Sequence, residues 1–265
     1  MAFAFHTDPA LYFKHQFEHA RDYVLPFIES SFPLKPGTEV LEIGCGEGGV
    51  LKAFLEKGCN CLGVDLSISK IEHGKTLLAT EIESGKMRFI AQDIYETQTA
   101  ESLTARFDLI ILKDTIEHIF HQEKIIAHLK TFLKPGGMVF YGYPPWYMPF
   151  GGHQQITKSK ILSRLPYYHL LPAAIYKSIL KALGEAPECI QELLEIKSTG
   201  ISTARFERIH AACGYGIVHR RLYFINPIYA WKFGLKPRLL PAWLRAIPYL
   251  RDFFCTTAWY LVKPL

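Results

Sequence analysis

Two features of the sequence point to an α/β fold in which helices cover both faces of a mostly parallel sheet. The chain has 265 residues, of which 49% are hydrophobic, so it is long enough to bury one full core. From Glu39 onward, short apolar runs alternate with longer amphipathic stretches. Short apolar runs predict buried strands, and their alternation with helices is typical of parallel sheets.

The elements are expected in a simple order along the chain. Residues 11–30 carry apolar and aromatic side chains near helical spacing, which predicts a leading helix before the turn at 33–37. Five strands then follow, at residues 40–43, 62–64, 87–91, 109–112 and 138–141. A helix at 205–213 and two further strands, at 215–224 and 255–262, bring the expected strand count to seven.

Two segments do not fit this alternation. Residues 144–197 form a stretch too long for a plain loop and contain short helical patterns, so we expect a helical cap. Residues 226–252 form a basic, aromatic insertion between the last two strands. We expect residues 1–265 to form a single domain that includes both segments.

Composition limits where such a protein works. No apolar run approaches the roughly 18 residues of a membrane span, and residues 1–8 lack the features of a signal peptide. The six cysteines are scattered, with no Cys-x-x-Cys pair to indicate a disulfide framework or a zinc site. We therefore expect a cytoplasmic protein in a reducing compartment.

The net charge of +5 is unevenly distributed. Residues 151–265 carry 16 basic and 6 acidic side chains, a balance of +10, which leaves −5 for the first 150 residues. This asymmetry predicts a cationic small molecule bound by the front half and an anionic substrate or surface met by the back half.

A glycine turn, VLEIGCGEGG at residues 40–49, follows the first predicted strand. Gly44, Gly46 and Gly49 satisfy the dinucleotide fingerprint, and Asp65 stands about 20 residues further on, where a ribose-binding carboxylate is expected. An oxidoreductase dependent on NAD(P) is therefore one hypothesis for this turn.

Charge favours a different cofactor. Glu42, Asp65 and Asp93 lie at or beside three successive strand ends, where open α/β sheets bind ligands. Carboxylates repel the pyrophosphate of a dinucleotide, whereas S-adenosylmethionine carries a sulfonium and an ammonium and no phosphate. The sequence thus favours S-adenosylmethionine.

The motifs taken together resemble class I S-adenosylmethionine-dependent methyltransferases of the broad quinone-biosynthesis and small-molecule type. The matching pieces are LEIGCGEGG (41–49), GVDLS (63–67), AQDIYE (91–96), FDLIILKDTIEHI (107–119) and LKPGGMVFYGYP (133–144). The resemblance implies a Rossmann-like sheet of seven strands with the last strand antiparallel.

The resemblance also assigns cofactor contacts by position. The methionyl end would meet Glu42 and the backbone of Gly44, Cys45 and Gly46. The ribose hydroxyls would meet Asp65, and the adenine would meet Asp93 and Ile94. Leu66 would also contact the cofactor, and Lys113 would line the site. The N-terminal helix of such enzymes often folds over the cofactor, which adds Tyr12, His15 and Gln16 as candidates.

Methyl transfer from a sulfonium is a direct displacement, so a general base is optional and matters most for a hydroxyl acceptor of high pKa. The candidate catalytic residues are His153, just past the fifth strand, and Glu117 with His118 after the fourth. With these candidates, O-methylation is favoured. The alternative for His153 is a cap hinge in which the ring only bonds backbone.

Residues near His153 suggest an acceptor pocket. The expected substrate contacts are Trp146, Tyr147, Phe150 and Gln154. Glu117 and His121 stand four residues apart, a spacing that can share a metal, but the sequence offers no third or fourth ligand and no metal is expected.

From Arg220 onward, basic residues alternate with aromatic ones, which is compatible with nucleic acid, a membrane surface or an anionic substrate. Without an RNA-binding signature, we expect an anionic or lipid-linked small-molecule acceptor, with peripheral membrane contact as an option and nucleic acid not favoured. A solvated helical hairpin is the alternative for this region. A non-catalytic ligand-binding protein of the same fold is the alternative for the chain.

Overall fold

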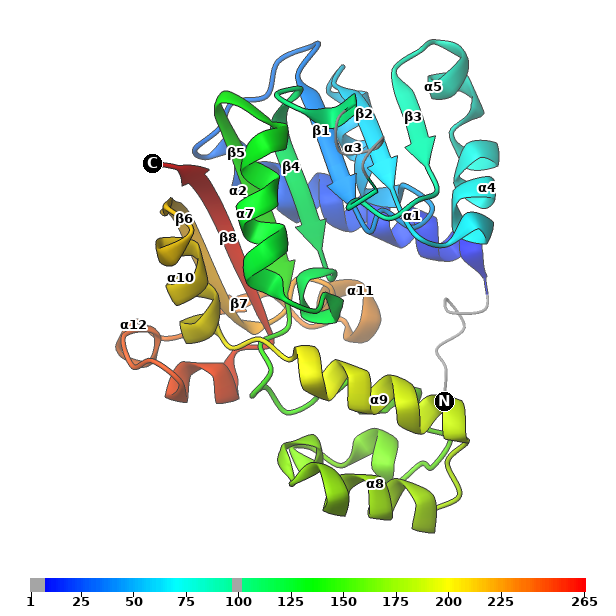
Figure 1. Ribbon diagram of the computed structural model, residues 1–265, viewed down its shortest axis with the longest axis vertical. Helices are drawn as coiled ribbons and strands as arrows, with labels where there is room; N and C mark the ends of the chain where they lie inside the picture. The colour runs from blue at the N-terminus through cyan, green and yellow to red at the C-terminus, as the bar shows by residue number, and fades with distance from the viewer. Residues whose placement is uncertain (1–7, 97–101) are drawn as a thin grey trace.

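The computed structural model describes residues 8–96 and 102–265; the first seven residues, where the sequence lacks signal-peptide features, lie outside this range. The described chain forms one sheet of eight strands in the order β3-β2-β1-β4-β5-β8-β6-β7 (Figure 1). The strands are β1 (Glu39–Ile43), β2 (Asn60–Val64), β3 (Met87–Ile90), β4 (Phe107–Lys113), β5 (Leu133–Tyr143), β6 (Tyr215–Ile225), β7 (Arg238–Leu239) and β8 (Thr257–Pro264).

Strand directions agree with the expected fold class. Strands β1 to β5 are parallel, whereas β8 is antiparallel to its neighbours β5 and β6, which confirms the predicted antiparallel last strand. The expected count of seven is one too low. The additional strand, β7, has two residues and pairs with Tyr223 and Ile225 at the sheet edge. A strand this short leaves no alternating pattern in a sequence.

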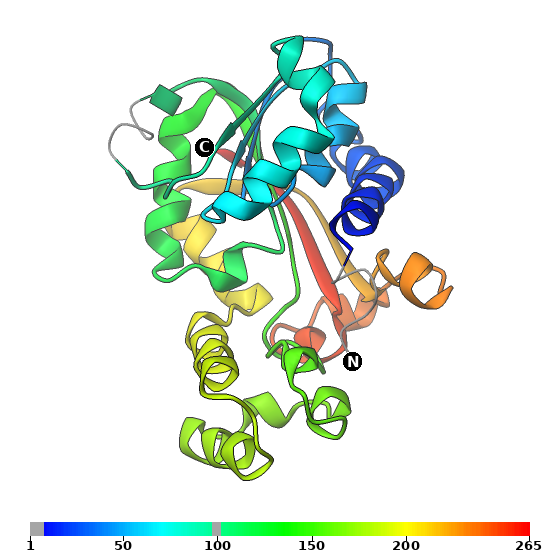
Figure 2. The ribbon, with the colours of Figure 1, turned by 90° about the vertical axis from the view of Figure 1, so that its right-hand side faces the viewer.

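Helices cover both faces of the sheet (Figure 2). Within β4, Ile110 and Leu112 point into one hydrophobic core, and Leu109 and Ile111 point into the other. One face carries α7 (Gln122–Phe132) and α10 (Thr203–Ala212), and the opposite face carries α1 (Pro9–His19), α2 (Leu25–Glu29) and α3 (Gly49–Glu56). Helices α4 (Ile68–Leu77) and α5 (Ala79–Glu83) connect β2 to β3.

The expected leading helix is present, with one irregularity. Asp8 caps its start by accepting a hydrogen bond from the Leu11 amide at 3.1 Å, and Pro9 occupies the first turn. A π-helical turn, Ala20–Val24, links α1 to α2, so that the helical path ends at Glu29.

Residues 144–199 extend beyond the carboxyl ends of the parallel strands, toward which the arrows of β1 to β4 point in Figure 1. This segment contains the 3-10 turns η4 (Gln154–Ile156), η5 (Leu162–Arg164) and η6 (Tyr168–Leu170) and the helices α8 (Ala173–Ala182) and α9 (Pro187–Thr199). It has its own apolar cluster, made of Leu162, Tyr168, Tyr176, Leu180, Ile190 and Leu193. We propose that the segment is a cap over the strand ends.

The insertion between β6 and β8 contains α11 (Tyr229–Phe233), β7, α12 (Ala242–Arg245) and η7 (Leu250–Phe254). A buried polar network ties η7 to α10. Asp252 accepts a 2.8 Å hydrogen bond from the Thr203 amide, and the Arg251 guanidinium lies 2.7 Å from both Thr203 Oγ1 and Glu207 Oε2. Among the described residues, no helix combines the length and the apolar composition of a membrane span.

Acid should weaken this fold through buried histidines such as His210, whose ring packs on Phe206 and Tyr141. Burial lowers the pKa of His210 from 6.5 to about 4, although its hydrogen bond with the Phe206 carbonyl opposes the shift. Because the unfolded chain then binds more protons below pH 6.5, His210 favours the fold above that pH and loses this contribution as the pH falls toward 4.

We therefore expect the free energy of unfolding attributable to His210 to fall by about 2 kcal/mol between pH 6.5 and 5. Urea unfolding at the two pH values measures it. The variant His210→Phe should lose about 2 kcal/mol less than the wild type over the same interval, and equal losses would refute the assignment.

Candidate functional site

The glycine turn lies at the carboxyl end of β1 and adopts the backbone that the sequence suggested. Gly44 has φ +74° and Gly46 has φ +53°, and a Cβ on Gly44 would lie 2.5 Å from Thr115 Oγ1. Asp65, after β2, accepts hydrogen bonds of 2.8 Å from the amides of Gly46 and Ser67. Each carboxylate oxygen retains a lone pair for a ligand hydroxyl.

Glu42 is the most deeply buried acid of this edge. Its side chain is 2% exposed, and its Oε2 has no hydrogen-bond partner among the described residues. Burial raises the pKa of Glu42 well above its ordinary value, Lys113 opposes the shift, and Asp65 and Asp114 reinforce it. A buried carboxyl oxygen without a partner is costly, so the site fits a ligand that brings a cation, such as the ammonium of S-adenosylmethionine.

Lys113 is the last residue of β4 and is buried at the same edge of the sheet. Its Nζ lies 2.5 Å from Asp114 Oδ2, and although burial acts against the charged amine, this carboxylate raises the pKa of Lys113. Asp114, which has the strained φ of +53°, was not among the site residues expected from the sequence. The sequence could have predicted Asp114, because this acid directly follows a strand, as Asp65 does.

Helix α1 covers the glycine turn. A Cβ on Gly49 would lie 2.7 Å from Gln16 Cβ, which shows how closely α1 packs on the start of α3. Burial raises the pKa of Tyr12, and the charge of Lys113 opposes this shift, so this hydroxyl faces the same site. His15 instead stacks on Trp231 of α11, with ring centroids 4.1 Å apart.

The remaining cofactor candidates lie around the same edge. Leu66 is 74% exposed after β2, and Asp93 is exposed after β3, where it accepts a 3.0 Å hydrogen bond from the Tyr95 amide. Ile94 is buried in the core. The Cys45 side chain points toward Gly63 of β2, since a Cβ there would lie 2.6 Å from its Sγ, so Cys45 offers a ligand its backbone. Their contacts with the cofactor stay predictions.

The three candidate catalytic residues come together in the structure. Glu117 and His118 belong to the 3-10 turn η3 (Ile116–His118), and His153 arrives from the start of the cap segment. Ligand atoms of the three side chains lie within 4.8 Å of one another, and the two imidazole centroids are 4.9 Å apart. Glu117 is buried, His153 is half-buried and His118 is exposed, so the cluster opens toward solvent.

The electrostatics of this cluster follow from its burial. Burial, reinforced by Asp114, raises the pKa of Glu117 well above its ordinary value. Burial lowers the pKa of His118 and lowers that of His153 to about 4, the latter helped by His118. Both imidazoles are therefore neutral at pH 7.

His121, which the helical spacing paired with Glu117, lies outside the cluster. Its side chain is 69% exposed, and its Nδ1 lies 3.7 Å from Glu123 Oε1. Residues 116–118 form a 3-10 turn rather than an α-helical one, so the expected alignment four residues apart does not arise.

The expected acceptor residues Trp146, Tyr147 and Gln154 make contacts within the protein. Trp146 contacts the His169 ring edge-on, at 4.7 Å between centroids, and Tyr147 stacks on Phe253 at 5.4 Å. Gln154 is fully buried and donates a 2.9 Å hydrogen bond to the Pro149 carbonyl.

Phe150, half-buried, accepts a 3.2 Å hydrogen bond from the His153 amide through its carbonyl. The two glycines before His153 are required by packing, because a Cβ on Gly151 would collide with the Trp146 carbonyl and one on Gly152 with the His169 ring. Substrate contact by Trp146, Tyr147, Phe150 and Gln154 stays a prediction.

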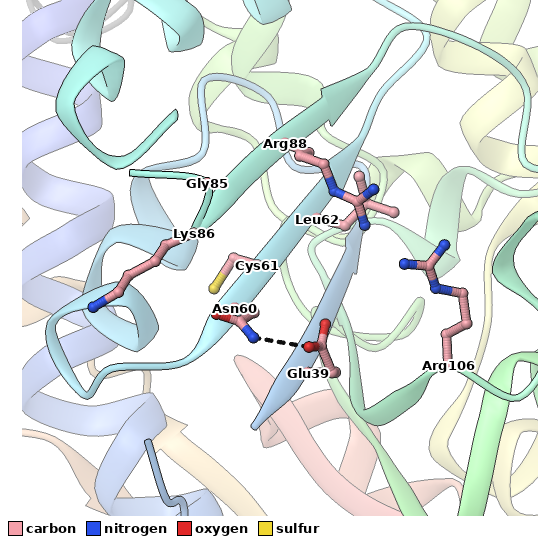
Figure 3. Close-up of a pocket in the computed structure, with 8 residues that line it drawn as sticks. All are labelled: Glu39, Asn60, Cys61, Leu62, Gly85, Lys86, Arg88 and Arg106. Atoms are coloured by element: carbon pink, nitrogen blue, oxygen red, sulfur yellow. Dashed lines mark hydrogen bonds between the residues drawn. The ribbon is translucent and has the colours of Figure 1, made fainter. Parts of the chain in front are cut away.

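A pocket of about 280 Å³ lies at the other end of the sheet, at the amino ends of β1 and β2 (Figure 3). Lys86, Arg88 and Arg106 line it, and Glu39 accepts a 2.8 Å hydrogen bond there from Asn60. Parallel sheets bind ligands at the carboxyl ends of their strands, and none of the candidate site residues lines this pocket, so we place the site at the carboxyl edge.

Comparison with known proteins agrees with this geometry. Residues 12–171 match the family model of a methyltransferase domain, and the chain belongs to that family. It is 30% identical over 116 residues to ubiquinone biosynthesis O-methyltransferase of Leptothrix cholodnii, covering 44% of this chain and 48% of that protein. It is 36% identical over 107 residues to phosphoethanolamine N-methyltransferase 1 of Zea mays, covering 40% and 20%.

The match with the ubiquinone enzyme thus spans about half of that protein's length. A solved geranyl diphosphate methyltransferase in complex with S-adenosylmethionine superposes with a TM-score of 0.59 at 16% identity, covering 95% of this chain and 87% of that one, which shows the fold. The prediction of a class I S-adenosylmethionine-dependent methyltransferase is confirmed, S-adenosylmethionine is the cofactor of the family, and the NAD(P) hypothesis has no support.

Asp65→Ala should weaken binding of S-adenosylhomocysteine by about 1–3 kcal/mol, because the ribose hydroxyls lose a charged acceptor and the Gly46 amide loses its partner. Isothermal titration measures the change. Asp22→Ala is the matched control, since Asp22 is exposed and pairs only with its neighbour Arg21 in the described contacts. Equal affinity of both variants would remove Asp65 from the cofactor site.

Proposed function

We propose that this chain is an S-adenosylmethionine-dependent O-methyltransferase acting on a small-molecule acceptor. The observation that carries the proposal is the cluster of Glu117, His118 and His153 beside the carboxyl edge of the sheet. A hydroxyl acceptor has to lose its proton as it attacks, whereas many other acceptors do not need a base. Two neutral imidazoles next to a carboxyl group suit that task.

The transfer step uses the chain's residues for alignment and proton removal. The acceptor oxygen attacks the methyl carbon, the new O–C bond forms, and the C–S bond breaks with its electron pair moving to sulfur. The hydroxyl proton passes to an imidazole of the cluster, with Glu117 beside it to stabilise the charge. Because the sulfonium is already an activated leaving group, orientation and exclusion of water account for most of the acceleration.

The acceptor we propose is anionic or lipid-linked. Cations accompany the site, since Lys232 of α11 interacts electrostatically with Asp114 and Lys113. In the insertion that continues from α11, Trp243 is 67% exposed and Tyr249 is 49% exposed. Exposed aromatic rings with basic neighbours favour the interface of an anionic membrane, so peripheral membrane contact belongs to the proposal, as does a cytoplasmic location.

A screen for transfer of a labelled methyl group tests activity and acceptor together. The purified protein is incubated with methyl-labelled S-adenosylmethionine and with cell extract separated into aqueous metabolites and lipids. We expect label on a hydroxyl group, recovered as a methyl ether or ester. Label on nitrogen or carbon would overturn O-methylation, and cofactor binding without any label would favour the non-catalytic alternative.

A further inference from the structure

The cavity of Figure 3 continues into a groove along β3, which is the terminal strand of the sheet. The groove has a volume of about 550 Å³, within the range of roughly 300–1,000 Å³ that is usual for small-molecule sites. Leu62, Arg88 and Arg106 line both spaces, so the two adjoin. None of the cofactor, catalytic or acceptor candidates lines either of them.

The cavity is cationic. Figure 3 shows the side chains of Arg88 and Arg106 at one side of it and that of Lys86 at the other. None of these three forms an ion pair with an acid in the described part of the chain, and Arg106 bonds only a backbone carbonyl, at 3.0 Å. Glu39, the acid in this lining, already accepts a hydrogen bond from Asn60. A concave site lined mainly by one sign of charge attracts the opposite charge, here an anion.

The groove is mostly apolar. Its apolar lining comprises Ala79 and Ile82 of α5, Met87, Phe89 and Ile90 of β3, and Leu103. Lys75 and Glu83 also line it, and their charges balance. An apolar groove that adjoins a cationic cavity is complementary to a molecule with an apolar chain and an anionic head.

Phe89 gives the groove a fixed wall. A Cβ on Gly48 would lie 2.9 Å from Phe89 Cζ, one on Gly74 would lie 2.8 Å from the same atom, and one on Gly63 would lie 3.0 Å from Phe89 Cδ1. The ring therefore occupies the space that three glycines leave free, and turning it away would open a void in a packed interior. Because this wall is already in place, a ligand needs little rearrangement to bind.

We propose that the cavity and the groove together bind a single-chain anionic amphiphile, a molecule with one alkyl or acyl chain and a phosphate or carboxylate head. The head lies at Arg88 and Arg106, which the two spaces share, and the chain follows β3. Guanidinium groups suit both kinds of head, because they donate paired hydrogen bonds to carboxylate and phosphate oxygens. The site does not depend on the identity of the methyl acceptor.

Calorimetry with dodecyl phosphate, kept below its micelle-forming concentration, tests the site. We expect one molecule per chain. Octyl phosphate should bind at least tenfold more weakly, because each buried methylene contributes a factor of about four. Inorganic phosphate and dodecanol, which bring only the head or only the chain, should each bind at least 100-fold more weakly. Laurate is titrated in parallel, and the tighter of the two anions identifies the head that the arginines prefer.

Variants locate the binding. Arg88→Glu and Arg106→Glu should each weaken dodecyl phosphate at least tenfold, since each removes charge-assisted hydrogen bonds to the head. Ala79→Phe should weaken it at least tenfold by placing a ring in the groove. All three positions are exposed, and circular dichroism checks that the variants are folded. Arg164→Glu is the matched control, because this exposed arginine of η5 lines neither space, and it should bind within twofold of the wild type.

Three results would overturn the site. They are absence of binding, binding of several molecules per chain with equal affinity for Arg88→Glu and wild type, and dodecanol binding as tightly as dodecyl phosphate. Vesicles of phosphatidylglycerol supply a fourth test. If they bind through Arg88 and Arg106 while dodecyl phosphate does not bind, the arginines meet a bilayer surface and the single-chain site is wrong.

Discussion

Replacing Arg251 with methionine is expected to lower the free energy of unfolding by about 3–5 kcal/mol. The Arg251 side chain is 4% exposed and lies 2.7 Å from Glu207, and it neighbours the fully buried Asp252. Methionine keeps the apolar stem but leaves buried Asp252 without its cation, whereas Glu207 keeps Arg220 at 2.6 Å. Burial already raises the pKa of Asp252, which its hydrogen bonds with Thr203 oppose. Urea unfolding followed by circular dichroism measures the loss.

An exposed ion pair supplies the control. Lys57 binds Glu29 at 3.0 Å with side chains 46% and 31% exposed, so Lys57→Met should cost no more than about 1 kcal/mol. The larger loss of stability expected for Arg251→Met comes from the contact between the insertion and α10, because Arg251 and Asp252 both bond Thr203 of α10. If Arg251→Met costs no more than Lys57→Met, the network does not hold the insertion in place.

The sequence predicts the part of the fold in which short apolar strands alternate regularly with amphipathic connections. Between Glu39 and Tyr143, each strand is an apolar run and each connection is amphipathic, so periodicity alone locates β1 to β5. Asp65 and Glu42 follow from the same rule, because the end of a buried strand in such a sheet faces the ligand. Their positions depend on contacts within one or two neighbouring elements.

The cluster of Glu117, His118 and His153 depends on contacts between residues far apart in the chain, so the sequence could suggest its members but not that they come together. His153 follows Glu117 by 36 positions along the chain, and the turn that carries Glu117 is fixed by α9, where Thr199 donates a hydrogen bond to the Glu117 carbonyl. That bond spans 82 positions, and no periodicity encodes it. The four-residue spacing of Glu117 and His121 would align the two side chains on an α-helix, but residues 116–118 form a 3-10 turn and His121 lies outside the cluster.

His153→Asn should lower kcat for a hydroxyl acceptor about 100-fold or more, because the imidazole is the proposed acceptor of the hydroxyl proton. Asparagine tolerates the left-handed backbone at φ +54°, so the change tests the ring rather than the strain. The affinity for S-adenosylhomocysteine should stay within about threefold, because the cofactor candidates lie at the carboxyl ends of β1 to β4 and the ring comes from the cap segment. Steady-state kinetics with the acceptor from the screen, together with calorimetry, measure both quantities.

The same assay on His121→Ala separates the cluster from its surroundings. His121 lies close along the chain and is exposed, so its removal should leave kcat within twofold. A variant His153→Asn with unchanged kcat and KM would return His153 to a hinge whose ring has no part in the reaction. A residue that acts on the acceptor alone changes the transfer step and leaves the binding of S-adenosylhomocysteine intact. A loss of affinity for S-adenosylhomocysteine equal to the loss of kcat would therefore mean that the cap segment shapes the cofactor site.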